Sequence, residues 1–217
     1  MAQKPQDKLD YTSLPPVTQE EFIPLMKQHM DYLAGRKGGT RLILKFRDLR
    51  GLDFSGIELM DAELMGSCLA GMKMAHGVFS GTNFFNCDMR DADLSHADFS
   101  RCDLRGALLA GANMMRVNLE EADLREGKIM VRDAEGVLVD MKRGEFEGTR
   151  TILTGARMTN AILNNIEANG ADFSDVDLTG ATIHFGNFEG ALFVGANFTD
   201  ADLSGTKFNH ANLSKAI

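Results

Sequence analysis

Large apolar side chains recur at every fifth residue along most of the chain. A count in fives that starts at Leu44 and ends at Ile129 meets eighteen apolar residues without an exception. Because 44% of the residues are apolar, an unbroken run of this length has a chance probability of about 4 in 10 million. A second run starts at Leu153, one residue out of phase, and reaches Leu213 with twelve of its thirteen positions large and apolar. A five-residue repeat therefore organises the chain.

The residue two places before each of these central positions is usually small, as at Ala92, Ala97 and Ala107. The pattern predicts that each unit turns one large and one small side chain inward. Ala168 supports this, because bulk has moved to Ile166 at the small position and the packed volume is conserved. Asp or Asn lies between the two positions, and Ser, Thr or Arg and then often Gly follow the centre. These residue types suit solvated turns.

A period of five matches neither the 3.6 residues of a helical turn nor the two residues of a strand. Each unit must be a short extended piece followed by a corner. Such a piece cannot bury its own apolar side, so the units are expected to wind into a solenoid whose stacked turns share one core. Backbone hydrogen bonds would then run between turns about 4.8 Å apart.

The stretches ADLSHADFSRCDLRGALLAGANM and GALFVGANFTDADLSGTKFNHANL closely resemble the pentapeptide repeat proteins, whose unit is Ala-(Asp or Asn)-(Leu or Phe)-x-x. The resemblance implies an all-β solenoid, a right-handed quadrilateral β-helix with four units per turn. It covers a first block at residues 43–131 and a second at 151–217. The 31 centres of the two runs would give about eight turns, a rod of roughly 35–40 Å.

Residues 1–17 are polar and contain three prolines, so we expect a flexible tail. Residues 18–42 are expected to form an N-terminal capping α-helix and its link to the solenoid. Thr18 and Glu21 match a capping box, and apolar residues follow at helical spacing. Because Pro24 removes a backbone hydrogen bond, the helix begins either after Thr18 or at Pro24 itself. In both cases it should cover the open end of the core, as in members of the family.

An insertion at residues 132–150 separates the two blocks. Between Ile129 and Leu153 the numbering advances by 24, one short of a multiple of five. We therefore expect that the blocks do not form a single uninterrupted helix. The segments KIMV and GVLVDM flank RDAE, which predicts a hairpin or a protruding loop. This is either an insertion tolerated at a corner or a projection that contacts a partner.

The repeats continue almost to the last residue. Phe208, Leu213 and Ile217 should therefore lie near an open edge of the final turn, and we expect two chains to meet there. The resemblance implies the same, because gyrase-binding members of the family dimerise through their C-terminal ends.

The chain carries 23 basic and 31 acidic residues, a net charge of −8, which argues against direct binding of nucleic acid or of an anionic membrane. Residues 153–217 contribute 3 basic and 7 acidic groups, whereas arginines are interleaved through the first block. The acidic end is either a solubilising surface or a candidate interaction surface. Its aspartates are Asp172, Asp175, Asp177, Asp200 and Asp202.

Three cysteines do not make a disulfide framework, and the first twenty residues lack the apolar core of a signal peptide. No apolar run approaches the roughly 20 residues of a membrane helix. We therefore expect a cytoplasmic protein.

No cofactor, metal or catalytic site is predicted. With four units per turn, His76 and His96 would stack twenty residues apart, but two imidazoles lack the third protein ligand that zinc normally needs. Cys87 and Cys102 occupy small inward positions, where a thiol acts as a small apolar group. We therefore do not expect an enzyme.

Met65 and Phe85 also lie twenty residues apart, each directly after a centre. They form an apolar ladder that either binds an apolar partner or is covered by the N-terminal helix or by the insertion.

These features favour a noncatalytic protein–protein interaction module or scaffold whose partner is unknown. Three alternatives stay open. The resemblance implies a DNA-mimicking binder of a type II topoisomerase (gyrase) that affects quinolone sensitivity. The open C-terminal edge suggests a structural assembly protein. The third alternative is a regulatory part of an enzyme.

Overall fold

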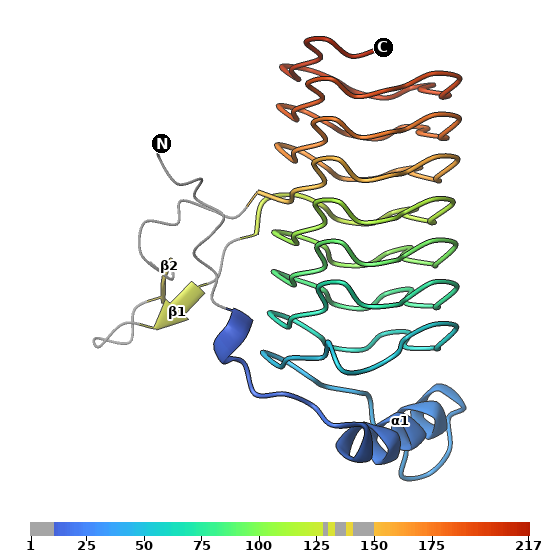
Figure 1. Cartoon of the computed structure of the whole chain (residues 1–217), viewed down its shortest axis with the longest axis vertical. Helices are drawn as coiled ribbons and strands as arrows, with labels where there is room; N and C mark the ends of the chain where they lie inside the picture. The colour runs from blue at the N-terminus through green and yellow to red at the C-terminus, as the bar shows by residue number, and fades with distance from the viewer. Residues whose placement is uncertain (1–10, 128–129, 133–137, 141–149) are drawn as a thin grey trace.

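The computed structural model describes residues 11–127, 130–132, 138–140 and 150–217. In chain order its elements are a 3₁₀-helix η2 (Tyr11–Ser13), the helix α1 (Gln19–Leu33) and the strands β1 (Met130–Arg132) and β2 (Leu138–Asp140). The repeat region is a stack of four-sided coils that rises from α1 to the C-terminus (Figure 1). No helix in the described ranges is long and apolar enough to span a membrane.

Each five-residue unit contributes a one-residue parallel bridge to the turns below and above it. Asp93 is typical, because it bridges to Lys73 below and to Asn113 above. The Leu94 N–H donates to the Asn113 carbonyl at 2.8 Å, and the Asp93 N–H donates downward to the Met72 carbonyl at 2.9 Å. The bridge spacing of 20 residues confirms that four units make one turn.

The corners require a left-handed backbone. The residue two places after a centre has a positive φ at nearly every corner that the structure describes, for example 58° at Asp91 and 71° at Gly111. Glycine, asparagine and aspartate adopt this conformation most easily. At Gly111 there is a second requirement, because a Cβ there would collide with Oδ1 of Asp91 in the turn below. The repeat therefore favours Gly at this corner for both backbone and packing reasons.

The centres from Leu44 to Leu124 and from Leu153 to Phe193 form one continuous column of buried side chains. Phe79, Phe84 and Phe99 pack with ring centroids 4.9–5.8 Å apart, and Ile166 and Ala168 are both fully buried, as the exchange of bulk predicted. The small inward positions also tolerate weakly polar groups, because their side chains reach a carbonyl in the turn below. The Ser67 hydroxyl donates to the Leu44 carbonyl at 2.7 Å, so it leaves no unpaired polar group in the core.

The stack continues across the phase break. Above Leu108 the bridge partner is Ile152 rather than a residue 20 positions later. The Leu109 N–H donates to the Ile152 carbonyl at 2.7 Å, and the Leu153 N–H donates to the Asp172 carbonyl at 2.7 Å. The expectation that the blocks could not form one uninterrupted helix is therefore wrong for the stack. A loop at a corner can absorb any number of residues, provided that the chain re-enters in register.

The insertion contains the predicted hairpin. Strands β1 and β2 are antiparallel, with Val131 opposite Val139. Ile129, counted above as a centre, lies outside the described residues, as does the turn between the strands. The chain returns to the coil at Thr151. The Thr151 hydroxyl accepts a hydrogen bond from the Gly106 N–H at 2.9 Å, and it lies 3.1 Å from the carbonyl oxygens of Leu104 and Arg125, to which it can donate. The second root of the insertion is thus fixed to the coil.

Helix α1 closes the N-terminal end of the coil. The capping box is present, because the Glu21 N–H donates to Thr18 Oγ1 at 3.2 Å and the Thr18 N–H donates to Glu21 Oε2 at 3.0 Å. The helix begins after Thr18 and includes Pro24, which selects the first of the two alternatives. Phe22 stacks on Phe54 of the first turn, with ring centroids 5.4 Å apart. The apolar face of α1 is therefore part of the core.

Residues 11–17, which we name the N-terminal strap, are docked on the coil and do not form the expected flexible tail. The Asp48 N–H donates to the Pro15 carbonyl and the Val17 N–H donates to the Asp48 carbonyl, both at 2.9 Å. Asp48 belongs to the first turn and has no turn below it. The strap supplies the missing hydrogen-bond partners, which is the physical reason for its order. Residues 1–10 lie outside the described residues.

His29 joins the cap to the coil. Its side chain is fully buried, and Nδ1 accepts a hydrogen bond from the Leu42 N–H at 3.1 Å. Burial lowers the pKa of His29, and Arg41 acts in the same direction, whereas Asp61 and the Met60 carbonyl oppose it. Protonation of Nδ1 would remove its lone pair and break the bond to Leu42.

The free energy of unfolding should therefore fall as the pH drops from 8 to 5.5. Below the ordinary imidazole pKa of about 6.5, the unfolded chain binds a proton that the folded chain still excludes. Urea denaturation at the two pH values measures the loss. His29→Gln, whose side-chain oxygen can still accept from Leu42, should reduce this pH dependence. Equal pH dependence in wild type and His29→Gln would contradict the assignment.

Candidate interaction surface

The outward positions form four walls, which we number by the order of their bridge residues. Wall 1 rises from Ile43 to Lys207, wall 2 from Asp48 to Asn212, wall 3 from Lys73 to Asn197 and wall 4 from Glu58 to Asp202. The insertion leaves the coil at the corner between walls 1 and 2, because it follows Leu124 of wall 1 and precedes Leu153 of wall 2. The residues around this corner are therefore the first candidates for a functional surface.

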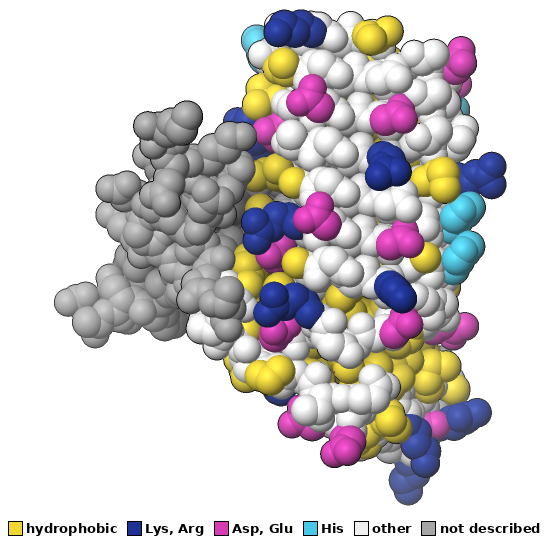
Figure 2. Space-filling model, in the orientation of Figure 1, with side chains coloured by type: hydrophobic (Ala, Val, Ile, Leu, Met, Phe, Trp, Pro, Cys, Tyr) yellow, Lys and Arg dark blue, Asp and Glu magenta, His cyan; other side chains and the backbone are white. Residues whose placement is uncertain are grey.

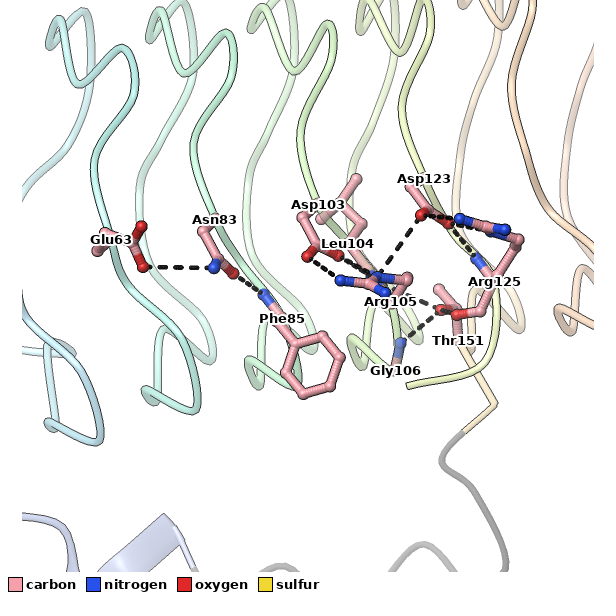
Figure 3. A network of polar contacts seen from close by, with 10 residues as sticks. All are labelled: Glu63, Asn83, Phe85, Asp103, Leu104, Arg105, Gly106, Asp123, Arg125 and Thr151. Carbon is pink, nitrogen blue, oxygen red and sulfur yellow. Dashed lines mark hydrogen bonds and ion pairs between the residues drawn. The ribbon is translucent and has the colours of Figure 1, made fainter. Parts of the chain in front are cut away.

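Wall 1 carries a ladder of arginine–aspartate pairs that leads to the root of the insertion (Figure 3). Asp103 accepts from Arg105 Nε at 2.9 Å and from a terminal guanidinium nitrogen at 2.7 Å. Arg105 Nε also lies 3.5 Å from Asp123 Oδ2 of the next turn. The Asp123 carboxylate in turn accepts hydrogen bonds from Arg125 Nε at 3.0 Å and from a terminal guanidinium nitrogen of Arg125 at 2.7 Å. The ladder links two successive turns through their side chains.

The same pairing occurs on wall 2, where Arg50 and Arg90 bind Asp48 and Asp88. The sequence signal is Asp-x-Arg with a centre in the middle, which was not recognised as a pairing motif from the sequence. Although burial opposes ionisation of Asp123, hydrogen bonds from Arg125 hold its pKa below the ordinary value. Four arginines of the first block thus pair with a carboxylate of their own unit: Arg50, Arg90, Arg105 and Arg125. Each partly exposed pair contributes roughly 0–1 kcal/mol.

The second block uses hydroxyl partners for its aspartates. Asp177 accepts from Thr179, and hydrogen bonds from Thr179 lower its pKa against the effect of burial. Asp202 accepts from Ser204 and lies 2.8 Å from His184 Nε2; these hydrogen bonds lower its pKa to about 2. Because Ser and Thr carry no charge, these carboxylates remain negative.

The five aspartates proposed as an acidic surface do not gather on one wall. Asp172, Asp177 and Asp202 lie on walls 2, 3 and 4, and Asp175 and Asp200 lie at the two corners between these walls. In the view of Figure 2, acidic and basic side chains are interspersed over the visible face of the coil. The negative charge of the second block is therefore spread around the rod.

Met65 and Phe85 do not form an open apolar ladder. Phe85 is only 8% exposed and Met65 is half-buried. The Arg105 guanidinium lies 5.3 Å from the centre of the Phe85 ring, a cation–π contact. The Phe85 N–H also donates to Asn83 Oδ1 at 2.9 Å. Phe85 is thus part of the wall 1 network shown in Figure 3.

The most exposed aromatic side chain of the described coil is Phe185, at 69%, on the corner between walls 4 and 1. Its φ of 58° lies in the left-handed region, which a bulky side chain adopts at a cost. The ring lies against the backbone of Gly205 in the turn above. This position was not predicted from the sequence, although a large side chain at a corner often held by Gly, Asn or Asp is a recognisable signal.

The C-terminal turn exposes both apolar side chains and backbone donors. Phe208 is partly buried against the core, Leu213 is 43% exposed and Ile217 is 81% exposed. Within the described residues, the N–H groups of Leu203, Phe208 and Leu213 have no backbone acceptor above them. The three predicted edge residues therefore lie together at one end of the rod.

The titratable side chains of the interior are poorly suited to chemistry. Burial raises the pKa of the Cys87 thiol to about 12 and that of Cys102 well above its ordinary value, which disfavours the reactive thiolate. His76 and His96 stack with ring centroids 4.8 Å apart, as expected. No group of three or more potential metal ligands occurs among the described residues.

Comparison with known sequences decides the family. The model of pentapeptide repeats matches residues 62–106, 92–128, 151–193 and 187–217, with eight copies. The chain belongs to the pentapeptide repeat family. Its fold is accordingly the right-handed quadrilateral β-helix with an N-terminal capping helix that the resemblance implied. No curated protein matches the sequence.

Several solved structures are similar to this pentapeptide repeat protein. A trypsin-treated form of QnrB1, described as a plasmid-mediated fluoroquinolone resistance protein, is 16% identical over 81% of each chain, with a TM-score of 0.43. HetL from Nostoc sp. strain PCC 7120, a protein involved in heterocyst differentiation regulation, is 22% identical over 87% of this chain and 94% of its own, with a TM-score of 0.28. A pentapeptide repeat protein from the Arabidopsis thaliana thylakoid lumen is 28% identical over 58% of this chain and 68% of its own, with a TM-score of 0.25.

Proposed function

We propose that this pentapeptide repeat protein is a noncatalytic scaffold that binds another protein through hairpin β1–β2 and the adjoining parts of walls 1 and 2. The observation that carries the proposal is the undisturbed stack beneath the insertion, where Leu109 and Leu153 keep the hydrogen bonds of a regular turn. The hairpin is thus added to a complete coil. Binding residues are often carried in this way, on loops positioned by a rigid scaffold.

The described residues next to the hairpin are held in place by hydrogen bonds and ion pairs. Thr151 fixes one root with hydrogen bonds to three different residues, and the Arg105 and Arg125 ladder stiffens the wall beside it. A pre-ordered surface loses little conformational entropy when a partner binds. In contrast, outward side chains on neighbouring walls point in different directions, so they do not surround a substrate in the way that catalytic groups must.

The gyrase-binding alternative is not favoured by the charge distribution. Duplex DNA carries about one negative charge per 1.7 Å of its axis. Here four arginines of the first block pair with its aspartates, and the five aspartates of the second block are spread over three walls and two corners. A DNA mimic would need a continuous negative side.

Replacement of residues 130–149 by a short Gly-Ser link should abolish recovery of the partner in an affinity pull-down from the native cell. The circular dichroism spectrum and the melting temperature should stay close to wild type, because the coil closes without these residues. Ile162→Ser, at a 41% exposed position on wall 4, is the matched control and should retain the partner. Full recovery of the same partner by the variant without the hairpin would contradict the proposal.

We also propose that the C-terminal turn binds a second copy of the chain. A two-fold arrangement would place the unpaired N–H groups at Leu203, Phe208 and Leu213 opposite the carbonyls of the same edge in the other copy. It would also bury Leu213 and Ile217, which are exposed in the single chain. Both features are self-complementary, as an isologous interface requires.

Light scattering at micromolar concentration should then give twice the 23.8 kDa of one chain. The double variant Leu213→Asp with Ile217→Asp should give the single-chain mass, because two charges would be buried in the interface. Ile162→Asp is the matched control at a similarly exposed position and should remain dimeric. A wild-type mass of 23.8 kDa would exclude this interface.

A further inference from the structure

The N-terminal strap covers an apolar strip on wall 2. At the outward positions where most units carry Asp or Asn, this part of the wall has Cys68, Leu108 and Ile152. Asp88, between Cys68 and Leu108, is the exception, and its buried carboxylate is paired with Arg90. The three apolar side chains are almost fully buried and form one cluster with Tyr11 of the strap. The half-buried Ala70 and Ala110 border the same cluster. The strip spans the junction between the two blocks, because Leu108 bridges to Ile152.

The strap occupies the strip through a simple pattern. Tyr11 and Leu14, three residues apart, supply the apolar contacts. The Tyr11 hydroxyl donates to the Asn86 carbonyl at 3.0 Å. Lower on the wall, Arg47 donates to the carbonyls of Pro15 and Pro16 at 3.1 and 2.9 Å. The wall therefore holds a segment that begins with the 3₁₀-helix η2, through one aromatic residue with a hydroxyl, one aliphatic residue and backbone carbonyls.

Most of the coil does not depend on the strap. Helix α1 has its own cap at Thr18, and Phe22 anchors it to the first turn. The bridges between successive turns form without the strap, which adds the bridge between Pro16 and Asp48 below the first turn. Among the described residues, two backbone hydrogen bonds join the strap to the coil, both at Asp48, and Val17 at the end of the strap is buried in the main core. The terminal part of such a segment can open locally at lower free energy than global unfolding.

We propose that the strip of Cys68, Leu108 and Ile152 is a docking surface for a peptide segment with the chemistry of the strap, and that the strap is its resident occupant. A partner segment with Tyr and Leu three positions apart displaces the strap and takes over its contacts. The apolar residues of the strip are then explained as a binding surface that the chain keeps covered when no partner is present. The bridge between Pro16 and Asp48 is the added-strand contact that recurs in peptide binding.

This inference rests on the proposed scaffold function in one respect, because the peptide segment that displaces the strap belongs to a protein partner. It concerns wall 2 and the strap, whereas the hairpin carries the proposal above. The test below uses the chain's own segment as the probe, so its failure would leave the hairpin experiment unaffected.

Cys68 provides a built-in reporter of strap opening. Its thiol is buried in the strip, and burial raises its pKa, so it should react slowly with iodoacetamide in the full-length wild-type chain. Tyr11→Ala should increase the alkylation rate of Cys68 at least tenfold, as followed by peptide mass spectrometry. Cys87 and Cys102 lie inside the coil and should stay unreactive, which shows that the coil remains folded.

A synthetic peptide with the sequence of residues 9–18 should then protect Cys68 of the Tyr11→Ala chain in a saturable manner. The same peptide with Ala in place of Tyr should not protect it. If all three cysteines of Tyr11→Ala react, the experiment is repeated with Tyr11→Phe, which keeps the ring and loses only the bond to Asn86.

Two results would overturn the proposal. Alkylation of Cys68 that is no faster in either Tyr11 variant than in wild type would show that the strap does not cover the strip. Faster alkylation without protection by millimolar peptide would show that the strip accepts only its tethered segment and is not a docking surface.

Discussion

The structure depends on the backbone hydrogen bond between successive turns. A five-residue unit has no hydrogen bonds of a helix and only one bridge residue of a strand, so it has no stability of its own. The N–H groups of its bridge and central residues are satisfied only when an equivalent unit lies directly below or above, as for Asp93, which donates to Met72, and Leu94, which donates to Asn113. The alternating large and small inward residues, the left-handed corners and the polar outward residues are all consequences of keeping these turns in register.

This constraint explains the two ends and the insertion together. At the first turn no lower turn exists, so the strap supplies bonds to Asp48 and α1 covers the core with Phe22. At the last turn the same donors are unpaired within the described chain, next to the exposed side chain of Ile217. At the insertion the stack is kept and the extra residues leave at a corner. The surfaces proposed for binding therefore lie where the regular stack is interrupted, capped or left open.

Much of the fold could be predicted from the sequence because every repeat unit has to meet the same physical requirements. The fivefold spacing identified the buried centres, and the exchange between Ile166 and Ala168 showed that two inward positions share one volume. The hairpin and the capping box were local signals and were also confirmed. Continuity across the insertion was missed, because the count of residues along the chain does not record where a loop returns.

The candidate surface was less predictable, since it depends on contacts between segments far apart in the sequence. Nothing in the polar sequence of residues 1–17 shows that Tyr11 packs against Ile152. Phe85 looked exposed because its position faces outward, but Arg105 of the next turn lies over it. The acidic residues of the second block looked like one surface because they are close in sequence, whereas consecutive units face different walls.

The central claim is that one continuous coil passes beneath the insertion, and native-state hydrogen exchange resolved by residue tests it most directly. The amides of Leu109 and Ile152, which donate across the junction to the Ile152 and Ala107 carbonyls, should exchange with protection factors within about tenfold of those of Leu94 and Phe173 inside the blocks. Equal protection would mean that the two blocks open as one unit. Fast exchange at Leu109 and Ile152, with slow exchange at Leu94 and Phe173, would show two separate stacks and contradict this account.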